Sequence, residues 1–389
     1  MAEWIECTLN DLGEIVGGAT PSTQREDYYG GDISWITPKD LSSLQGRYIS
    51  RGERNITKKG LASCSAQLMP PKTILFTSRA PIGYVAIADQ TVCTNQGFKS
   101  IVPNAKVNPL FLYYLLVYNK EAIEAMGSGT TFKEVSGKAM RAVKVHIPSD
   151  MQSQIKIASL LDSIDSKIEA NAKLNDNLEQ QAASIFTEWL STCADASTIG
   201  DMSYNILDHS PVGSEQIRLL NSSDVTEGFF PIAPLVPNKD LKGHFKKRFK
   251  FGDILYSEIR PRNHHYGFVL FDASDYIAST RLMVIRAIEN KVSPAMLYQY
   301  LLLPEVEAEF TLKTESRSGT FPQGNYADMA SIQVPYSPTN SQTAVSEILS
   351  RIRFAIAQNQ FESQRLAELR DTLLPKLMSG EIDVSAVQP

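Results

Sequence analysis

Residues 33–40 read Ile-Ser-Trp-Ile-Thr-Pro-Lys-Asp, and residues 217–224 read Ile-Arg-Leu-Leu-Asn-Ser-Ser-Asp. Both stretches begin with apolar alternation and end on an aspartate, 184 positions apart. Later landmarks recur at a similar distance: Arg79-Ala80-Pro81 with Arg260-Pro261, Gly129-Thr130 with Gly319-Thr320, and Val145-His146-Ile147-Pro148 with Ile332-Gln333-Val334-Pro335. A repeat of this length indicates a duplicated domain rather than a solenoid, whose repeats span roughly 20–50 residues.

The length of 389 residues predicts about two to three domains. No run of 18 or more apolar residues occurs, so we expect no membrane span, and the N-terminus lacks the pattern of a signal peptide. The four cysteines, Cys7, Cys64, Cys93 and Cys193, form no Cys-x-x-Cys pair and are expected to be reduced thiols in a cytoplasmic protein. The net charge of −5 does not indicate nucleic-acid binding, so any DNA-binding surface must be local.

Each copy is predicted to be a mixed α/β domain. Short β-like runs and one amphipathic helix occur in each, with strands expected at 73–77, 83–87, 251–256 and 267–271 and helices at 109–126 and 294–310. In both copies the helix leads into a glycine-threonine loop. The predicted domains are residues 1–148 and 194–337, and helical segments are predicted at 149–193 and 338–389.

Each helical segment carries a heptad pattern. Apolar or matched polar residues alternate at spacings of four and three, which is typical of a coiled-coil seam. The seam residues that define the pattern are Ile164, Ile168, Asn171, Leu178 and Ile185 in the first helix, and Ile352, Ile356, Asn359, Leu366 and Leu373 in the second. The two series superimpose at an offset of 188, so Asn171 matches Asn359, while Arg370 departs from the pattern. A helix from 157 to 189 would be about 50 Å long. The alternative is two ordinary amphipathic helices that pack separately on their own domains.

Catalytic signatures are scarce in the sequence. There is no P-loop, no complete Gly-x-Gly-x-x-Gly and no His-Glu-x-x-His. Asp165-Ser166-Lys167 and Asp240-Leu241-Lys242 have the Asp-x-Lys spacing of some nucleases, but this tripeptide is common by chance. His264-His265 is a poor metal site because adjacent strand residues point to opposite faces, and no cysteine–histidine cluster indicates zinc. We therefore expect no metal and no cofactor on this chain.

A basic segment in the second copy is the strongest indication of DNA binding. Residues 242–250 read Lys-Gly-His-Phe-Lys-Lys-Arg-Phe-Lys, with five basic residues and no acid. Such residues contact phosphates, while arginine, asparagine and histidine reach base edges in the major groove. The DNA-binding candidates of the second copy are Lys242, Lys246, Lys247, Arg248, Lys250, Arg260, Arg262, His264, His265 and Arg317, and those of the first are Arg79, Asn95, Gln96, Lys133 and Lys138. Lys246, Lys247 and Arg248 are predicted to set affinity, and Arg262 and His264 to affect sequence choice.

The chain also contains motifs of a known family. They are Gly17-Gly18-Ala19-Thr20-Pro21-Ser22, the run Gly30 to Leu41, Ser78-Arg79-Ala80-Pro81-Ile82-Gly83, Asn95-Gln96-Gly97, and Leu374-Pro375-Lys376-Leu377-Met378-Ser379-Gly380-Glu381-Ile382. In combination they resemble the DNA-specificity subunit of type I restriction–modification systems over essentially the whole chain. On these motifs Thr20, Ser22 and Lys39 join the DNA-binding candidates. The second copy departs at Ser257-Glu258-Ile259-Arg260-Pro261, which lacks the glycine after the proline.

The resemblance implies an α+β fold with two target-recognition domains separated by two long helices that pack as an antiparallel coiled coil. Each domain would bind one half of a split, asymmetric DNA site, and the helices would set the gap. The helices would also dock two methyltransferase subunits, which use S-adenosylmethionine to methylate adenine N6. Two restriction subunits, which use ATP and magnesium, can join, so catalysis lies on partners and this chain is not itself an enzyme.

Two other functions stay open from the residues alone. One is a stand-alone nuclease that uses the Asp-x-Lys fragments with magnesium. The other is a coiled-coil adaptor that never contacts DNA.

Overall fold

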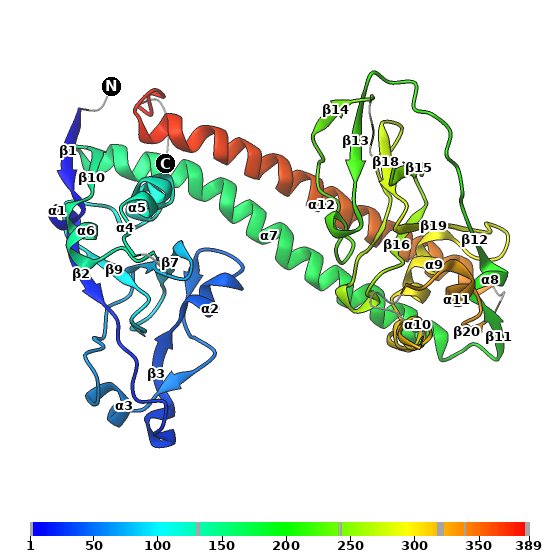
Figure 1. Ribbon diagram of the computed structural model, residues 1–389, viewed down its shortest axis with the longest axis horizontal. Helices are drawn as coiled ribbons and strands as arrows, with labels where there is room; N and C mark the ends of the chain where they lie inside the picture. The colour runs from blue at the N-terminus through cyan, green and yellow to red at the C-terminus, as the bar shows by residue number, and fades with distance from the viewer. Residues whose placement is uncertain are drawn as a thin grey trace. The chain divides into compact units, whose positions relative to one another are not determined.

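The computed structural model describes residues 3–129, 133–239, 241, 243–316, 323–337 and 340–385. The chain divides into two compact units, Met1–Glu169 with Arg365–Pro389, and Ala170–Gln364. Each unit combines a mixed α/β domain with parts of two long helices, α7 (Met151–Leu190) and α12 (Asn340–Met378) (Figure 1). The predicted fold class is confirmed.

The domain of the first unit contains three sheets. The first sheet pairs β1 (Trp4–Thr8) with β10 (Lys144–Pro148). The second sheet has five strands in the order β2 (Gly13–Gly17), β9 (Lys99–Pro103), β6 (Ile74–Ser78), β7 (Ile82–Ala88) and β4 (Tyr48–Ile49). The third sheet has three strands in the order β5 (Asn55–Ile56), β3 (Tyr29–Ile36) and β8 (Cys93–Thr94). Its helices are α1 (Leu9–Leu12), η1 (Glu26–Tyr28), α2 (Pro38–Ser42), α3 (Lys58–Ala62), α4 (Pro109–Tyr118), α5 (Lys120–Ala125) and α6 (Gly137–Ala142). The main core packs α4 against the five-stranded sheet and the ends of α7 and α12.

The domain of the second unit repeats this plan. Here β11 (Asp195–Thr198) pairs with β20 (Gln333–Tyr336). A second sheet has four strands in the order β12 (Ser203–Asn205), β19 (Leu282–Ala287), β16 (Ile254–Ser257) and β17 (Tyr266–Phe268). A third sheet has four strands in the order β14 (Leu235–Pro237), β13 (Gln216–Leu220), β18 (Tyr276–Ser279) and β15 (Phe245–Lys247). Its helices are α8 (Ile199–Met202), η2 (Ser222–Asp224), η3 (Pro261–Asn263), α9 (Pro294–Leu301), α10 (Pro304–Glu315) and α11 (Tyr326–Ala330). The β3–β8 and β13–β18 pairs are both parallel, so the duplication extends to strand direction.

The repeated aspartates have a shared structural role. Asp40 accepts a hydrogen bond from the backbone N–H of Thr37 at 2.7 Å, and Asp224 accepts one from the backbone N–H of Asn221 at 2.7 Å. Each carboxylate completes a capping box at the first turn of a short helix that follows a strand. The two sequence stretches are therefore alike because each must turn a strand into a helical turn.

The single helices predicted at 109–126 and 294–310 are each two helices. The first chain segment breaks at Asn119, between α4 and α5, and the second breaks at Leu302–Leu303, between α9 and α10. Pro304 explains the second break, because proline disfavours helical geometry in the residue before it and occupies the first position of α10.

The long helices pack antiparallel in each unit, side by side in Figure 1. In the first unit the carboxylate of Asp165 accepts a hydrogen bond from Arg370 at 2.8 Å, and in the second Glu179 pairs with Arg353. Arg370, the residue that departs from the heptad pattern, is therefore the partner of a buried aspartate. The ten predicted seam residues are all buried or half-buried; Ile164, Asn171, Ile352 and Ile356 are buried, and Ile168, Leu178, Ile185, Asn359, Leu366 and Leu373 are half-buried.

A polar layer interrupts the seam in the second unit. Asn359 Nδ2 donates to Asn175 Oδ1 at 2.8 Å, and Asn171 Nδ2 donates to Glu362 Oε2 at 2.8 Å and to Ser363 Oγ at 3.2 Å. At the repeat offset of 188, Asn171 corresponds to Asn359 and Asn175 corresponds to Ser363. The contact between Asn171 and Ser363 is therefore the repeat equivalent of the contact between Asn359 and Asn175. The polar layer thus follows the symmetry of the repeat, and paired amides are a known means of fixing helix register.

Replacing both Asn175 and Asn359 with leucine is expected to raise the free energy of unfolding by about 1 kcal/mol, because an apolar seam is more stable than a polar one. The double variant should also populate additional oligomers, because the register is less strictly specified. Chemical denaturation and light scattering measure the two effects. Asn177→Leu, on the exposed side of α7, is the control and should show neither effect; an unchanged or lower stability of the double variant would contradict the expectation.

Candidate nucleic-acid interface

The basic segment of the second unit follows strand alternation. Phe245, Lys247 and Phe249 are buried, at 9%, 6% and 4% exposure, whereas Lys246 and Lys250 are exposed and Arg248 is half-buried. Side chains in a strand point alternately to opposite faces, so the two phenylalanines determine that Lys247 points inward with them. Lys246 and Lys250 remain available to phosphates from the other face.

Lys247 is therefore not the phosphate contact that we predicted. Its ammonium donates to the carbonyl oxygen of Leu282 at 2.7 Å and lies 3.2 Å from Glu258 Oε1. Glu258 Oε2 in turn accepts from Gln323 at 2.7 Å. Lys247 therefore belongs to a polar network that joins β15 to the turn after β16 and to the segment before α11.

Arg248 is also partly engaged within the fold. Its guanidinium donates to the carbonyl oxygen of Ser274 at 2.8 Å. Two further candidates of this unit, Lys242 and Arg317, lie outside the described residues. Thr130 of the first glycine-threonine loop and the Gly319-Thr320 pair of the second lie outside them as well.

The loop at 260–266 carries the predicted base-reading residues, and its backbone is unusual. Arg260 and His264 adopt left-handed conformations, with φ of 48° and 54°, and so does Glu227 opposite them, with φ of 48°. Such conformations are uncommon for residues other than glycine and concentrate at functional sites. The Glu227 N–H donates to the carbonyl oxygen of His264 at 2.8 Å, which ties the two turns together.

Carboxylates surround the side chains of this loop. His264 lies 2.9 Å from Glu227 through Nδ1 and 2.9 Å from Glu307 through Nε2. Arg262 forms an exposed ion pair with Glu315 at 3.1 Å. His265 Nδ1 lies 2.9 Å from the carbonyl oxygen of Val225. Arg262 and His264 thus have acidic partners within the fold, and any contact with a base must exchange those partners.

The hydrogen bond to Glu227 raises the pKa of His264 above its ordinary value, and Glu307 adds to the effect against the opposing influence of partial burial. Because the pKa of His264 is higher in the folded state, its protonated form stabilises the folded protein. This stabilisation is fully present below the unfolded-state pKa of about 6.5, and it is lost as the pH rises through the folded-state pKa. His264→Gln should therefore flatten the loss of stability of the second unit from about pH 6.5 upward. Thermal unfolding across this range measures it, with the exposed His209→Gln as control; equal pH profiles for wild type and His264→Gln would contradict it.

The first unit gathers several candidates at one place, where β8 ends. Thr20 hydrogen-bonds to Gln96, and Asn95 Oδ1 accepts from the N–H of Gly97 at 2.9 Å. Gly18 makes this approach possible, because a Cβ there would lie 2.0 Å from the carbonyl oxygen of Asn95. Ser22 is exposed nearby in sequence but has no described contact with this group.

Three other cations of the first unit, Arg79, Lys99 and Lys39, have acidic partners. Arg79 and Lys99 both lie near Glu134, at 3.6 Å and 3.3 Å, and Lys39 pairs with Glu53 at 2.7 Å. Lys133 and Lys138 are exposed. Arg51 lines a groove together with Lys39, and we did not predict it as a DNA-binding candidate. The sequence does contain an indication of a basic surface here, since Arg51, Arg54, Lys58 and Lys59 lie within nine residues.

The second tripeptide with nuclease-like spacing, at 240–242, includes residues outside the described part of the chain, and the first has a structural role. Asp165 is 7% exposed and is bound by Tyr114 and Arg370 within the fold. Within the described ranges, no group of three or more histidine, cysteine, aspartate or glutamate side chains could hold a metal ion.

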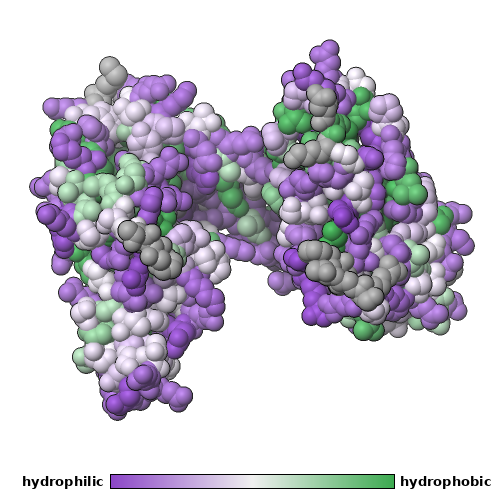
Figure 2. Space-filling model, in the orientation of Figure 1, coloured by the Kyte–Doolittle hydropathy of each residue, from purple (hydrophilic) through white to green (hydrophobic). Residues whose placement is uncertain are grey.

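The visible face of each unit is mostly hydrophilic, with apolar residues in small patches (Figure 2). None of the helices that the structure describes is long and apolar enough to cross a membrane.

Comparison with known proteins agrees with this architecture. The model of the type I restriction modification DNA specificity domain matches residues 1–180 and 231–370. The MjaIX type I restriction enzyme specificity subunit of Methanocaldococcus jannaschii is 32% identical and the match covers 98% of this chain and 94% of that protein. The HindI specificity subunit of Haemophilus influenzae is 34% identical over 45% of this chain and 39% of its own length.

A solved structure has the same fold. The crystal structure of the S subunit of a type I restriction-modification system from M. genitalium superimposes with a TM-score of 0.66 at 18% identity, covering 97% of this chain and 96% of that one. Together with a family model that matches most of the chain, these relatives show that the chain belongs to the family of type I restriction–modification DNA-specificity subunits.

Proposed function

We propose that this chain is the DNA-specificity subunit of a type I restriction–modification complex and carries no catalytic site of its own. Each mixed α/β domain binds one half of a bipartite, asymmetric DNA site. The paired helices α7 and α12 set the distance between the half-sites and dock two methyltransferase subunits. The observation that carries the proposal is the duplication, in which the order β2-β9-β6-β7 recurs as β12-β19-β16-β17 and the helix seam recurs with it.

The chemistry is assigned to partners. Two methyltransferase subunits use S-adenosylmethionine to methylate adenine N6, and two restriction subunits use ATP and magnesium when present. The contacts of Asp165 with Tyr114 and Arg370 argue against the alternative of a stand-alone nuclease built on that tripeptide.

On DNA, Lys246 and Lys250 supply phosphate contacts in the second domain. The group formed by Thr20, Asn95 and Gln96 supplies contacts in the first. Two-fold arrangements on DNA commonly place half-sites about one helical turn apart, roughly 34–36 Å. Because the two domains differ in these loops, the two half-sites differ in sequence.

Mapping of methylated adenines tests the proposal. The full chain is co-expressed with its methyltransferase in cells that lack other adenine methylation. The expected result is one new motif with two unlike half-sites and a fixed gap. No new motif, or a continuous or palindromic one, would contradict the proposal. Cutting of DNA by the purified chain with magnesium alone would favour the nuclease, and absence of DNA binding by the methyltransferase complex would favour the adaptor.

A further inference from the structure

A buried arginine joins the first domain to α7. Arg47 lies in the segment between α2 and β4, and only 5% of its side chain is exposed. Its guanidinium Nη1 donates to Asp162 Oδ1 at 2.5 Å, Nε donates to Glu169 Oε1 at 3.1 Å, and Nη2 donates to Ser166 Oγ at 3.0 Å. These three acceptors lie three or four residues apart, so they share one face of α7. The rigid fork of a guanidinium is suited to several directed bonds of this kind.

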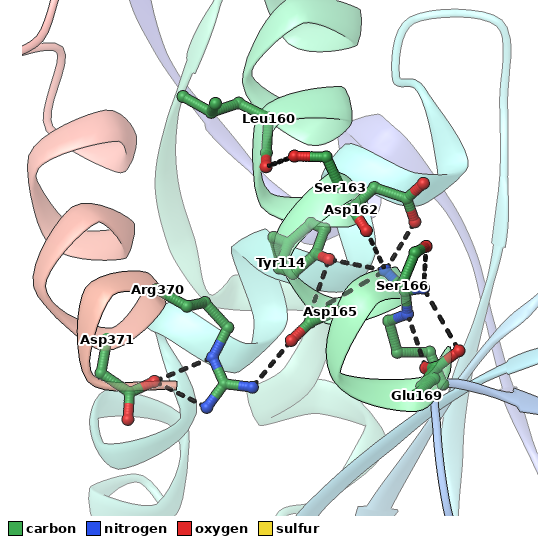
Figure 3. A network of polar contacts seen from close by, with 10 residues as sticks. Tyr114, Leu160, Asp162, Ser163, Asp165, Ser166, Glu169, Arg370 and Asp371 are labelled. Carbon is green, nitrogen blue, oxygen red and sulfur yellow. Dashed lines mark hydrogen bonds and ion pairs between the residues drawn. The ribbon is translucent and has the colours of Figure 1, made fainter. Parts of the chain in front are cut away.

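The contact continues through a second layer. Arg47 Nη1 also donates to the hydroxyl of Tyr114 on α4 at 2.9 Å, and Tyr114 donates to Asp165 Oδ2 at 2.7 Å. Asp165 Oδ1 accepts from Arg370 of α12 at 2.8 Å (Figure 3). A continuous polar chain thus connects the domain, α4, α7 and α12 within the first unit.

The backbone of the Arg47 segment is held from its other side by β7. The carbonyl oxygen of Arg47 accepts from the N–H of Ile87 at 2.7 Å, which fixes the segment against β7. Gly46, with φ of 108°, passes close to the Glu169 carboxylate, and a Cβ there would lie 3.0 Å from its oxygen. Further along, the N–H of Glu53 donates to Asp40 at 2.7 Å, next to the Lys39–Glu53 ion pair.

We propose that Arg47 is a positioning residue that fixes the angle of the first recognition domain on α7 and thereby the gap between half-sites that the chain accepts. This inference rests on the proposed function. A residue that contributed only stability would change the amount of folded protein and leave the preferred gap unchanged. A residue that fixes the angle changes which gaps are accepted.

The test uses the full chain with its methyltransferase subunits. DNA substrates carry the mapped half-sites at the native gap and at gaps one base pair shorter and longer. For Arg47→Gln, the preference for the native gap over the altered gaps should fall by about tenfold, the ratio that corresponds to the loss of one charge-assisted hydrogen bond. Arg47→Lys keeps the charge but loses the fork, and it should give a smaller fall. Each half-site should keep its sequence preference in both variants.

Arg25→Gln is the matched control, because Arg25 also pairs with an aspartate of the first unit but is 60% exposed; its gap preference should equal that of the wild type. Ser166→Ala, which removes one acceptor and leaves the charges intact, serves if Arg47→Gln fails to fold, and it too should weaken the gap preference. Wild-type gap preference in the folded Arg47 variants, or in Ser166→Ala, overturns the inference while the proposed function stands. A wild-type chain that directs methylation to no gapped site overturns both.

Discussion

Lys247→Met is expected to lower the free energy of unfolding of the second unit by about 3–5 kcal/mol, because it leaves the carboxylate of Glu258 without its buried partner. The two side chains are only 7% and 14% exposed, so water compensates little. The salt dependence of DNA binding should stay unchanged, since the ammonium of Lys247 points into the domain. Urea denaturation measures the first quantity, and DNA binding by the methyltransferase complex at several salt concentrations measures the second.

Lys246 and Lys250 provide the matched comparison on the same segment. Replacing both with glutamine should reduce the slope of log affinity against log salt by about two, roughly one for each phosphate contact. Stability should change by less than about 0.5 kcal/mol, as is usual for exposed positions. The assignment of the two faces is wrong if Lys247→Met reduces the slope by about one while the double glutamine variant leaves it unchanged.

Arg286→Met is the second large effect that we expect, again about 3–5 kcal/mol of destabilisation, because it leaves a fully buried carboxylate unpaired. Asp253 has no exposed surface, and its two carboxylate oxygens accept from Arg286 at 2.6 Å and 2.8 Å. It also accepts from the backbone N–H of Lys250 at 2.8 Å, so the end of the basic segment depends on the same group. Denaturation of wild type and variant gives the difference.

A double-mutant cycle separates this explanation from simple loss of packing. Adding Asp253→Asn to Arg286→Met removes the unpaired charge, so the double variant should be more stable than Arg286→Met alone. Arg262→Gln, which breaks an exposed ion pair with Glu315, is the control and should cost less than about 1 kcal/mol. A double variant that is less stable than Arg286→Met would contradict the buried-charge explanation.

Periodic features were predictable from sequence because they depend on neighbours in the chain. The heptad seam follows from spacing alone, whereas the spacing of Asp40 and Asp224 indicates the duplication but not the capping boxes that they complete. The inward direction of Lys247 was predictable as well, since Phe245 and Phe249 lie two positions to either side of it. The density of basic residues in this segment says nothing of which face each one occupies, so the prediction that Lys247 contacts phosphate was wrong.

Partners distant in sequence could not be predicted. Arg47 binds residues of α7 that lie 115 to 122 positions away, and nothing in the local pattern marks it as buried. His264 likewise lies between Glu227 and Glu307, which come from a turn and a helix distant in the chain. The positions of such charges depend on how the elements pack, and that packing is decided by the whole core rather than by any one segment.

The two ion pairs between the long helices bear on which helix α7 can pair with. Both place the acid on α7 and the arginine on α12: Asp165 with Arg370, and Glu179 with Arg353. Because α7 contains no arginine, two α7 helices from separate copies would bury Asp165 without such a partner. Breaking a buried ion pair by removing one partner costs about 3–5 kcal/mol. The charge pattern therefore favours pairing of α7 with α12 over pairing of two α7 helices from separate copies.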